Sequence, residues 1–257
     1  IIDASWHMPA QKRNPAEEYL NAHIPNSVFF DLDENSKKDT DLPHMLPNQV
    51  VWGKIMSSLG INNNDDILIY DNSDLKSSCR LWFSLLYFGH DEKKIHILNG
   101  GLKKWIFENK PITKLTTEII KSKYVANEKE NLVVSFDQIK KNILSKSFNV
   151  IDARSLERFE GKVSEPRKGL RSGHIQNSFC LPFNQCINQK TGEFKNLEEL
   201  RELFNQNENI EKRLDQVFTC GSGITAAVLA YAYKMVNNDY IPKMYDGSWS
   251  EYGKYPA

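Results

Sequence analysis

The chain has 257 residues, with 33 lysines and arginines balanced by 33 aspartates and glutamates. A net charge of zero gives no electrostatic reason to expect a nucleic-acid partner or an anionic membrane, and no apolar run is long enough to span a bilayer. The length favours two domains over one.

Short apolar, β-branched runs alternate with helical patterns along the chain. A strand-like segment opens it at residues 1–3. The predicted elements that follow are a helix over 50–59, a strand over 67–70, a helix over 78–88, a strand over 95–98, a helix over 136–144 with Ser135 as its N-cap, a strand over 150–152, a helix over 197–205, a strand over 216–219 and a helix over 225–235. This alternation predicts a parallel sheet with helices on both faces in each half of the chain.

The two halves of the chain repeat one another. Ile-Ile-Asp-Ala at 1–4 returns as Val-Ile-Asp-Ala at 150–153, and Asn-Gly-Gly at 99–101 returns as Asp-Gly-Ser at 246–248. The number of residues between each segment and its counterpart is nearly constant, which predicts a duplicated domain. We expect a first domain over 1–109, a linker over 110–131 and a second domain over 132–257. The second copy has a segment before its first strand that the first copy lacks, so about 15 residues are expected to be missing from the start.

Cys220 ends the apolar run 216–219 and opens the loop Cys-Gly-Ser-Gly-Ile-Thr, which leads into a predicted helix. Glycine tolerates positive φ, so this backbone can curl around the sulfur. Backbone N–H groups and a helix N-terminus in such a loop stabilise a thiolate and leave the sulfur exposed. The first copy has Asp71 at the matching position, followed by a loop without glycines. Only the second copy is therefore predicted to carry a nucleophile.

The residues around Cys220 exclude several kinds of cysteine chemistry. A phosphatase loop needs an arginine six residues on to grip phosphate, where this chain has Ala226. A thioredoxin-like site needs a second cysteine at the place of Gly223. The remaining chemistry is sulfur transfer, in which a thiolate accepts a sulfur as a persulfide and passes it on. The four cysteines show no zinc-type spacing, and the other three are read as structural (Cys79, Cys180 and Cys186).

The chain resembles the rhodanese superfamily, and within it the two-domain 3-mercaptopyruvate sulfurtransferases. The matching segments are the Cys220 loop, Phe-Phe-Asp-Leu-Asp at 29–33, His-Met-Leu-Pro at 44–47, Glu-Pro-Arg at 165–167 and Tyr-Asp-Gly-Ser-Trp-Ser-Glu at 245–251. The resemblance implies two tandem rhodanese-like α/β domains, each a mainly parallel sheet flanked by helices. It also implies a non-catalytic first domain, a catalytic second domain and an active site in the cleft between them.

The resemblance also assigns roles to individual residues. Cys220 is the nucleophile, and Ser222, His44 and Asp33 resemble the family's proposed Ser–His–Asp relay. Arg158 and Arg167 match the family's two substrate-binding arginines, whose guanidinium forks suit an α-keto acid. The loop backbone is expected to stabilise the persulfide, which adds four residues to the substrate-binding set (Gly221, Gly223, Ile224 and Thr225). Thiosulfate-using rhodaneses carry cations in this loop, so its neutral residues favour an organic donor.

These features predict a 3-mercaptopyruvate sulfurtransferase that releases pyruvate and passes sulfur from Cys220 to thioredoxin, another thiol or cyanide. No cofactor or metal is expected. Thiosulfate sulfurtransferase activity and a non-enzymatic sulfur-carrier or interaction module are the alternatives. We expect a monomer without a nucleic-acid or membrane partner. The expected location is the cytoplasm, or mitochondria if a leader has been removed.

Overall fold

The chain folds into two α/β units in the computed structural model, which describes residues 1–206, 210–211 and 213–255. Unit 1 comprises Ile1–Asp39, Leu46–Lys129 and Gln189–Glu193. Unit 2 comprises Thr40–Met45, Glu130–Asn188 and Phe194–Ala257. The six residues Thr40–Met45, which carry His44, therefore group with the second unit although they lie within the first half of the sequence.

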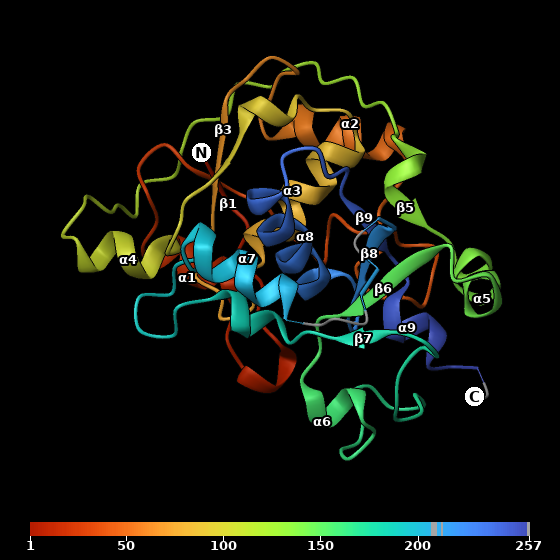
Figure 1. Ribbon diagram of the computed structural model, residues 1–257. Helices are drawn as coiled ribbons and strands as arrows, with labels where there is room; N and C mark the ends of the chain where they lie inside the picture. The colour runs from red at the N-terminus through yellow and green to blue at the C-terminus, as the bar shows by residue number, and fades with distance from the viewer. Residues whose placement is uncertain (207–209, 212, 256–257) are drawn as a thin grey trace. The chain divides into compact units, whose positions relative to one another are not determined.

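Unit 1 is built on a four-stranded parallel sheet with the strand order β2-β1-β3-β4, of which Figure 1 labels β1 and β3. The strands are β1 (Ile2–Asp3), β2 (Val28–Phe29), β3 (Ile67–Tyr70) and β4 (Ile95–Ile97). The helices are α1 (Pro15–Asn21), α2 (Gln49–Ser58), α3 (Ser78–Tyr87) and α4 (Gly101–Phe107), with short 3-10 turns η1 (Pro9–Gln11) and η2 (Glu92–Lys94). Helix α3 packs on β3 and β4 and is buried along nearly its whole length, so it forms the centre of this unit's core.

Large aromatic side chains fill the core of unit 1. Trp52 of α2 stacks on Phe88 with a ring-centroid distance of 4.5 Å and meets Phe30 at 5.7 Å. The extended stretch 110–129 covers this core, because Tyr124 is buried and stacks on His90. Backbone hydrogen bonds, such as Asn127 N to Phe88 O at 3.0 Å, hold the stretch to unit 1.

Unit 2 is built on a five-stranded parallel sheet with the strand order β5-β9-β8-β6-β7. The strands are β5 (Val133–Val134), β6 (Phe148–Asp152), β7 (Phe179–Cys180), β8 (Asp215–Thr219) and β9 (Lys243–Tyr245). The helices are α5 (Phe136–Ser145), α6 (Leu156–Phe159), α7 (Leu197–Asn205), α8 (Ile224–Val236) and α9 (Ser248–Tyr252), with 3-10 turns η3 (Glu130–Leu132) and η4 (Phe183–Cys186). Ser135 begins α5 with a capping box, as its sequence predicts.

Alternating side chains of the unit 2 strands pack under helices on opposite faces of the sheet. Val150 and Val217 join Ile139 of α5 and Trp249 of α9 in one buried cluster. Phe218, the next residue of β8, points the other way and meets Phe204 of α7. The predicted fold class, with two mainly parallel sheets each flanked by helices, is thus confirmed. The long predicted helices and strands are confirmed as well, with ends that differ by one or two residues.

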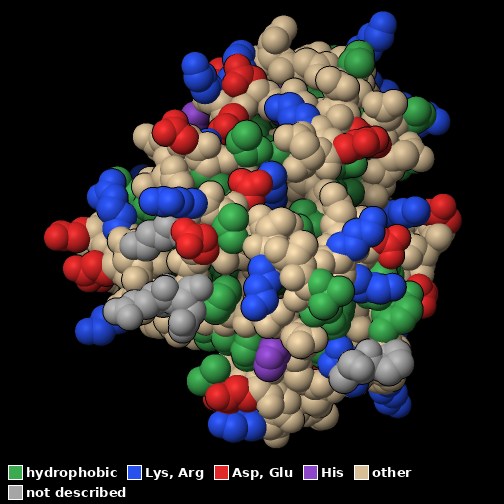
Figure 2. Space-filling view, turned by 45° about the vertical axis from the view of Figure 1, so that its right-hand side comes forward, with side chains coloured by type: hydrophobic (Ala, Val, Ile, Leu, Met, Phe, Trp, Pro, Cys, Tyr) green, Lys and Arg blue, Asp and Glu red, His purple; other side chains and the backbone are tan. Residues whose placement is uncertain are grey.

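Cations and anions are interspersed over the surface seen in Figure 2, as the balanced composition leads one to expect. Among the residues that the structure describes, no helix has both the length and the apolar character needed to cross a lipid bilayer.

Candidate active site

Cys220 lies between the end of β8 and the start of α8, at the carboxyl edge of the parallel sheet. Its loop curls back through Gly223, which has a φ of 83° and donates its backbone N–H to the Cys220 sulfur at 3.1 Å. Ile224 is buried as the first residue of α8, and Thr225 is half-buried beside it. Cys220 itself is only 2% exposed, so the expectation of an exposed sulfur is wrong.

Arg158 and Arg167 lie directly over Gly221 in the nucleophile loop. A β-carbon at Gly221 would stand 3.2 Å from Arg158 Nη2 and 3.7 Å from Arg167 Nη1. A side chain at this position would therefore crowd the Arg158 guanidinium group, which glycine leaves free to approach the loop. The structure brings both predicted arginines to the nucleophile loop, where their charges favour an anionic group beside Cys220.

A buried chain of alternating charges holds Arg158 in place. Glu165 accepts hydrogen bonds from Arg158 Nη2 at 2.6 Å and Nε at 3.2 Å, and from Arg154 Nη1 at 2.9 Å. Arg154 also pairs with Asp152 at 2.7 Å and lies over the Trp249 ring. Burial alone would lower the pKa of Arg154, but its two carboxylate partners raise it above the ordinary value. The sequence reasoning matched Glu165 to a family segment but gave neither it nor Arg154 a role.

Ser222 connects Arg167 to His44. Its hydroxyl oxygen lies 3.2 Å from Arg167 Nη2 and 3.0 Å from His44 Nδ1. A guanidinium group can only donate, so the Ser222 oxygen accepts from Arg167 and its own proton is available to His44. His44 is buried and has a φ of 60°, an uncommon backbone conformation for a residue other than glycine.

Asp33, the third member of the predicted relay, belongs to unit 1. Within that unit its two carboxylate oxygens each lie 3.0 Å from Trp6 Nε1, which donates to them. The part of Asp33 in the relay stays a prediction.

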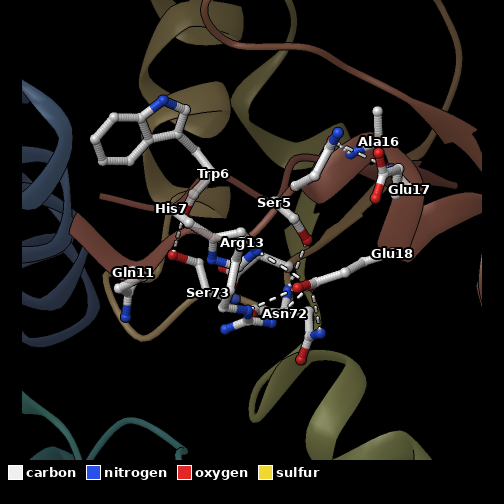
Figure 3. A network of polar contacts seen from close by, with 12 residues as sticks. Ser5, Trp6, His7, Gln11, Arg13, Ala16, Glu17, Glu18, Asn72 and Ser73 are labelled. Atoms are coloured by element: carbon white, nitrogen blue, oxygen red, sulfur yellow. Dashed lines mark hydrogen bonds and ion pairs between the residues drawn. The ribbon is translucent and has the colours of Figure 1, made fainter. Parts of the chain in front are cut away.

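In unit 1, the loop that matches the Cys220 loop binds the carboxylate of its own Asp71. Asp71, in the place of Cys220, accepts hydrogen bonds from Ser73 N at 2.9 Å and Ser78 N at 3.0 Å. Figure 3 shows the polar network beside this loop, in which Arg13 binds the Glu18 carboxylate and also reaches the backbone carbonyl of Asn72. The arginine near this loop is thus already paired with a protein anion.

The other cysteines lack an environment that activates a thiol. Burial raises the pKa of Cys186 to about 12, and burial and then nearby carboxylates raise the pKa of Cys180 to about 12. Cys79 is fully buried. In the described part of the chain, no group of three or more His, Cys, Asp or Glu side chains could hold a metal ion.

A strand-end cysteine in a curled loop, with two arginines over the loop and a Ser–His pair beside it, defines a site for thiol-dependent group transfer. A family model for the rhodanese-like domain matches residues 2–108 and again 135–255. The chain therefore belongs to the rhodanese family and has two rhodanese-like domains, as its sequence predicts.

Several full-length relatives are similar to the whole chain. The chain is 36% identical to the 3-mercaptopyruvate sulfurtransferase of Escherichia coli K12, covering 98% of the chain and 88% of the relative. It is 37% identical to the mitochondrial thiosulfate/3-mercaptopyruvate sulfurtransferase 1 of Arabidopsis thaliana, covering 100% and 72%. The crystal structure of SseA from Escherichia coli is similar with a TM-score of 0.86 at 34% identity, covering 97% of the chain and 92% of SseA.

Proposed function

We propose that the chain is a sulfurtransferase that takes sulfur from 3-mercaptopyruvate through a persulfide on Cys220. The observation that carries this proposal is the pair of arginines over Gly221, beside a cysteine whose sulfur already accepts a backbone N–H. Two adjacent guanidinium groups can hold the carboxylate and the keto oxygen of an α-keto acid. The names of the similar full-length proteins support the same donor.

The transfer breaks one C–S bond and forms one S–S bond. The Cys220 thiolate attacks the donor sulfur, and the electron pair of the C–S bond moves onto carbon 3 to give the enolate of pyruvate. The donor's thiol proton reaches this enolate through the Ser222 hydroxyl, which His44 and Arg167 hold in place. The products are pyruvate and the Cys220 persulfide anion.

The second half of the reaction regenerates the thiolate. An acceptor thiol gives its proton to the persulfide anion, and the resulting thiolate attacks the outer sulfur. The S–S bond breaks, the acceptor leaves as a new persulfide, and Cys220 returns as the thiolate. Backbone N–H groups of residues 221–225 stabilise the negative charge on sulfur in the thiolate and in the persulfide anion. Thioredoxin, another thiol or cyanide serves as acceptor. For the location of the protein in the cell, we keep the prediction from the sequence: the cytoplasm, or mitochondria if a leader has been removed.

A donor comparison combined with mass spectrometry tests the proposal. We expect kcat/KM to be higher for 3-mercaptopyruvate than for thiosulfate, and the protein to gain about 32 Da, one sulfur, after donor treatment. Cys220→Ser should remove this adduct and Cys180→Ser should keep it. A higher kcat/KM for thiosulfate contradicts the donor assignment. An absent adduct, or one that survives Cys220→Ser, contradicts the enzyme assignment and favours an interaction module.

A double-mutant cycle tests the Ser–His relay. If Ser222 and His44 act as one unit, Ser222→Ala and His44→Ala should each lower kcat, and the double variant should lose little more than either single variant. Losses that multiply in the double variant would show that the two residues act independently. Asp33→Asn, measured in the same assay, tests whether this carboxylate belongs to the unit.

A further inference from the structure

Helix α9 binds the carbonyl groups of the nucleophile loop. Trp249 N donates to Cys220 O at 2.9 Å, and Ser250 N donates to Gly221 O at 2.9 Å. The Ser250 hydroxyl donates to the same Gly221 oxygen at 2.6 Å. Ser250 is buried, so water does not replace these bonds.

These contacts orient the loop's N–H groups. In a planar trans peptide the C=O and N–H bonds point in opposite directions. When α9 holds the Gly221 carbonyl, the Ser222 N–H of the same peptide points away from α9. By the same geometry, the bond from Trp249 to Cys220 O directs the Gly221 N–H away from the helix. Helix α9 therefore sets the direction of two N–H dipoles in the loop that carries the sulfur.

Comparison with unit 1 shows which of these hydrogen bonds both copies of the domain share and which occurs only beside the cysteine. Leu102 matches Trp249 in the repeat and donates its N–H to Asp71 O at the same distance, 2.9 Å. Lys103 matches Ser250, but its side chain binds Asp74. The Asn72 carbonyl, which matches Gly221 O, instead accepts from the Arg13 side chain at 3.2 Å. The serine hydroxyl on the loop carbonyl is thus a feature of the copy that has the cysteine.

We infer that Ser250 is a positioning residue for the loop at Cys220. It fixes the Gly221–Ser222 peptide, and the next peptide along the chain carries the Gly223 N–H that donates to the Cys220 sulfur at 3.1 Å. Its hydroxyl provides a second hydrogen bond to Gly221 O and keeps the Gly221–Ser222 peptide from rotating. Sulfur then faces fixed dipoles, which stabilise its negative charge as thiolate and as persulfide. The inference rests on the proposed function for the persulfide, but the effect on the thiolate exists without any donor.

The rate at which iodoacetamide alkylates Cys220 in the donor-free protein at pH 7 tests this inference. We expect Ser250→Ala to slow alkylation about fivefold, the factor that corresponds to one net hydrogen bond. Ser250→Thr keeps the hydroxyl and should stay within about twofold of the unchanged protein. Ser178→Ala is the matched control, since Ser178 makes an equivalent 2.6 Å hydroxyl-to-carbonyl bond, to Ile175 O, away from the loop.

The outcomes separate positioning from mere stability. Slower alkylation in Ser250→Ala with unchanged alkylation in Ser178→Ala supports the inference, whatever the Tm of the two variants. An unchanged rate in Ser250→Ala, or an equal loss in both variants, overturns it. If Ser250→Ala does not fold, Ser250→Val, which matches Ser250→Thr in shape but lacks the hydroxyl, replaces it in the same comparison. Because no donor is used, failure of the sulfurtransferase assay leaves this result interpretable.

Discussion

Replacing Glu165 by glutamine should both destabilise unit 2 and weaken donor binding. The Glu165 side chain is 2% exposed and accepts three hydrogen bonds from two arginines. Removing one partner of a buried ion pair costs roughly 3–5 kcal/mol. Glutamine keeps one acceptor oxygen and Arg158 is 23% exposed, so we expect the lower end, about 3 kcal/mol. For a unit of about 130 residues, that is a fall in Tm of about 11 °C.

The kinetic effect follows from the orientation of Arg158. Without the carboxylate, its guanidinium group no longer faces Gly221 in one fixed position, and KM for 3-mercaptopyruvate should rise about tenfold with a smaller change in kcat. Calorimetry and steady-state kinetics measure the two effects. Glu160→Gln is the control, because Glu160 pairs with Lys162 on the surface, and it should stay within about 0.5 kcal/mol. A Glu165→Gln variant with the original Tm and KM would refute the reasoning.

Three further predictions concern the rest of the chain. Asp71→Ala should lower the unfolding free energy of unit 1 by about 2–4 kcal/mol in urea, because two buried N–H groups lose their acceptor, while kcat/KM stays unchanged; an unaltered midpoint contradicts this. Burial, opposed in part by hydrogen bonds from Ser5, raises the pKa of Asp3 from 3.8 to about 6, so its contribution to stability is present below pH 4 and is lost as the pH rises through 6. Asp3→Asn should abolish this loss, of the order of 3 kcal/mol, in urea midpoints compared at pH 4 and pH 7, and an equal pH dependence in both proteins would show that another group is responsible. Iodoacetamide at pH 8 should modify Cys220 before Cys186, whose pKa burial raises to about 12, and peptide mass spectrometry reporting the reverse order argues against Cys220 as the reactive thiol.

The long elements of the fold were predictable because each has a clear hydrophobic period. The helix at Leu197–Asn205 and the strand at Ile67–Tyr70 lie where their patterns place them. The strands at Val28–Phe29 and Phe179–Cys180 have two residues each, too few to show any period. Their strand identity comes from pairing with β1 and β6, which is a tertiary contact.

The candidate site was predictable to the extent that its residues are marked by local sequence. The glycines that follow Cys220 predict the curled loop, and Arg158 and Arg167 match a family pattern. Glu165 and Ser250 also lie in segments that match the family, but the match gave neither of them a role. Their importance follows from what they touch: a pair of arginines in one case and a loop carbonyl 29 residues away in the other.

By itself, the sequence determined that the chain is a duplicated α/β protein with one nucleophilic copy, because hydrophobic period, repeat spacing and a Cys-for-Asp exchange are properties of neighbouring residues. Only the tertiary structure decided how that nucleophile is held. Cys220 is buried and not exposed, and the Gly223 N–H donates to its sulfur. The direction of the loop dipoles and of the Arg158 guanidinium depends on hydrogen bonds from α9 and Glu165, and such bonds form only once the folded sheet brings distant segments within about 3 Å.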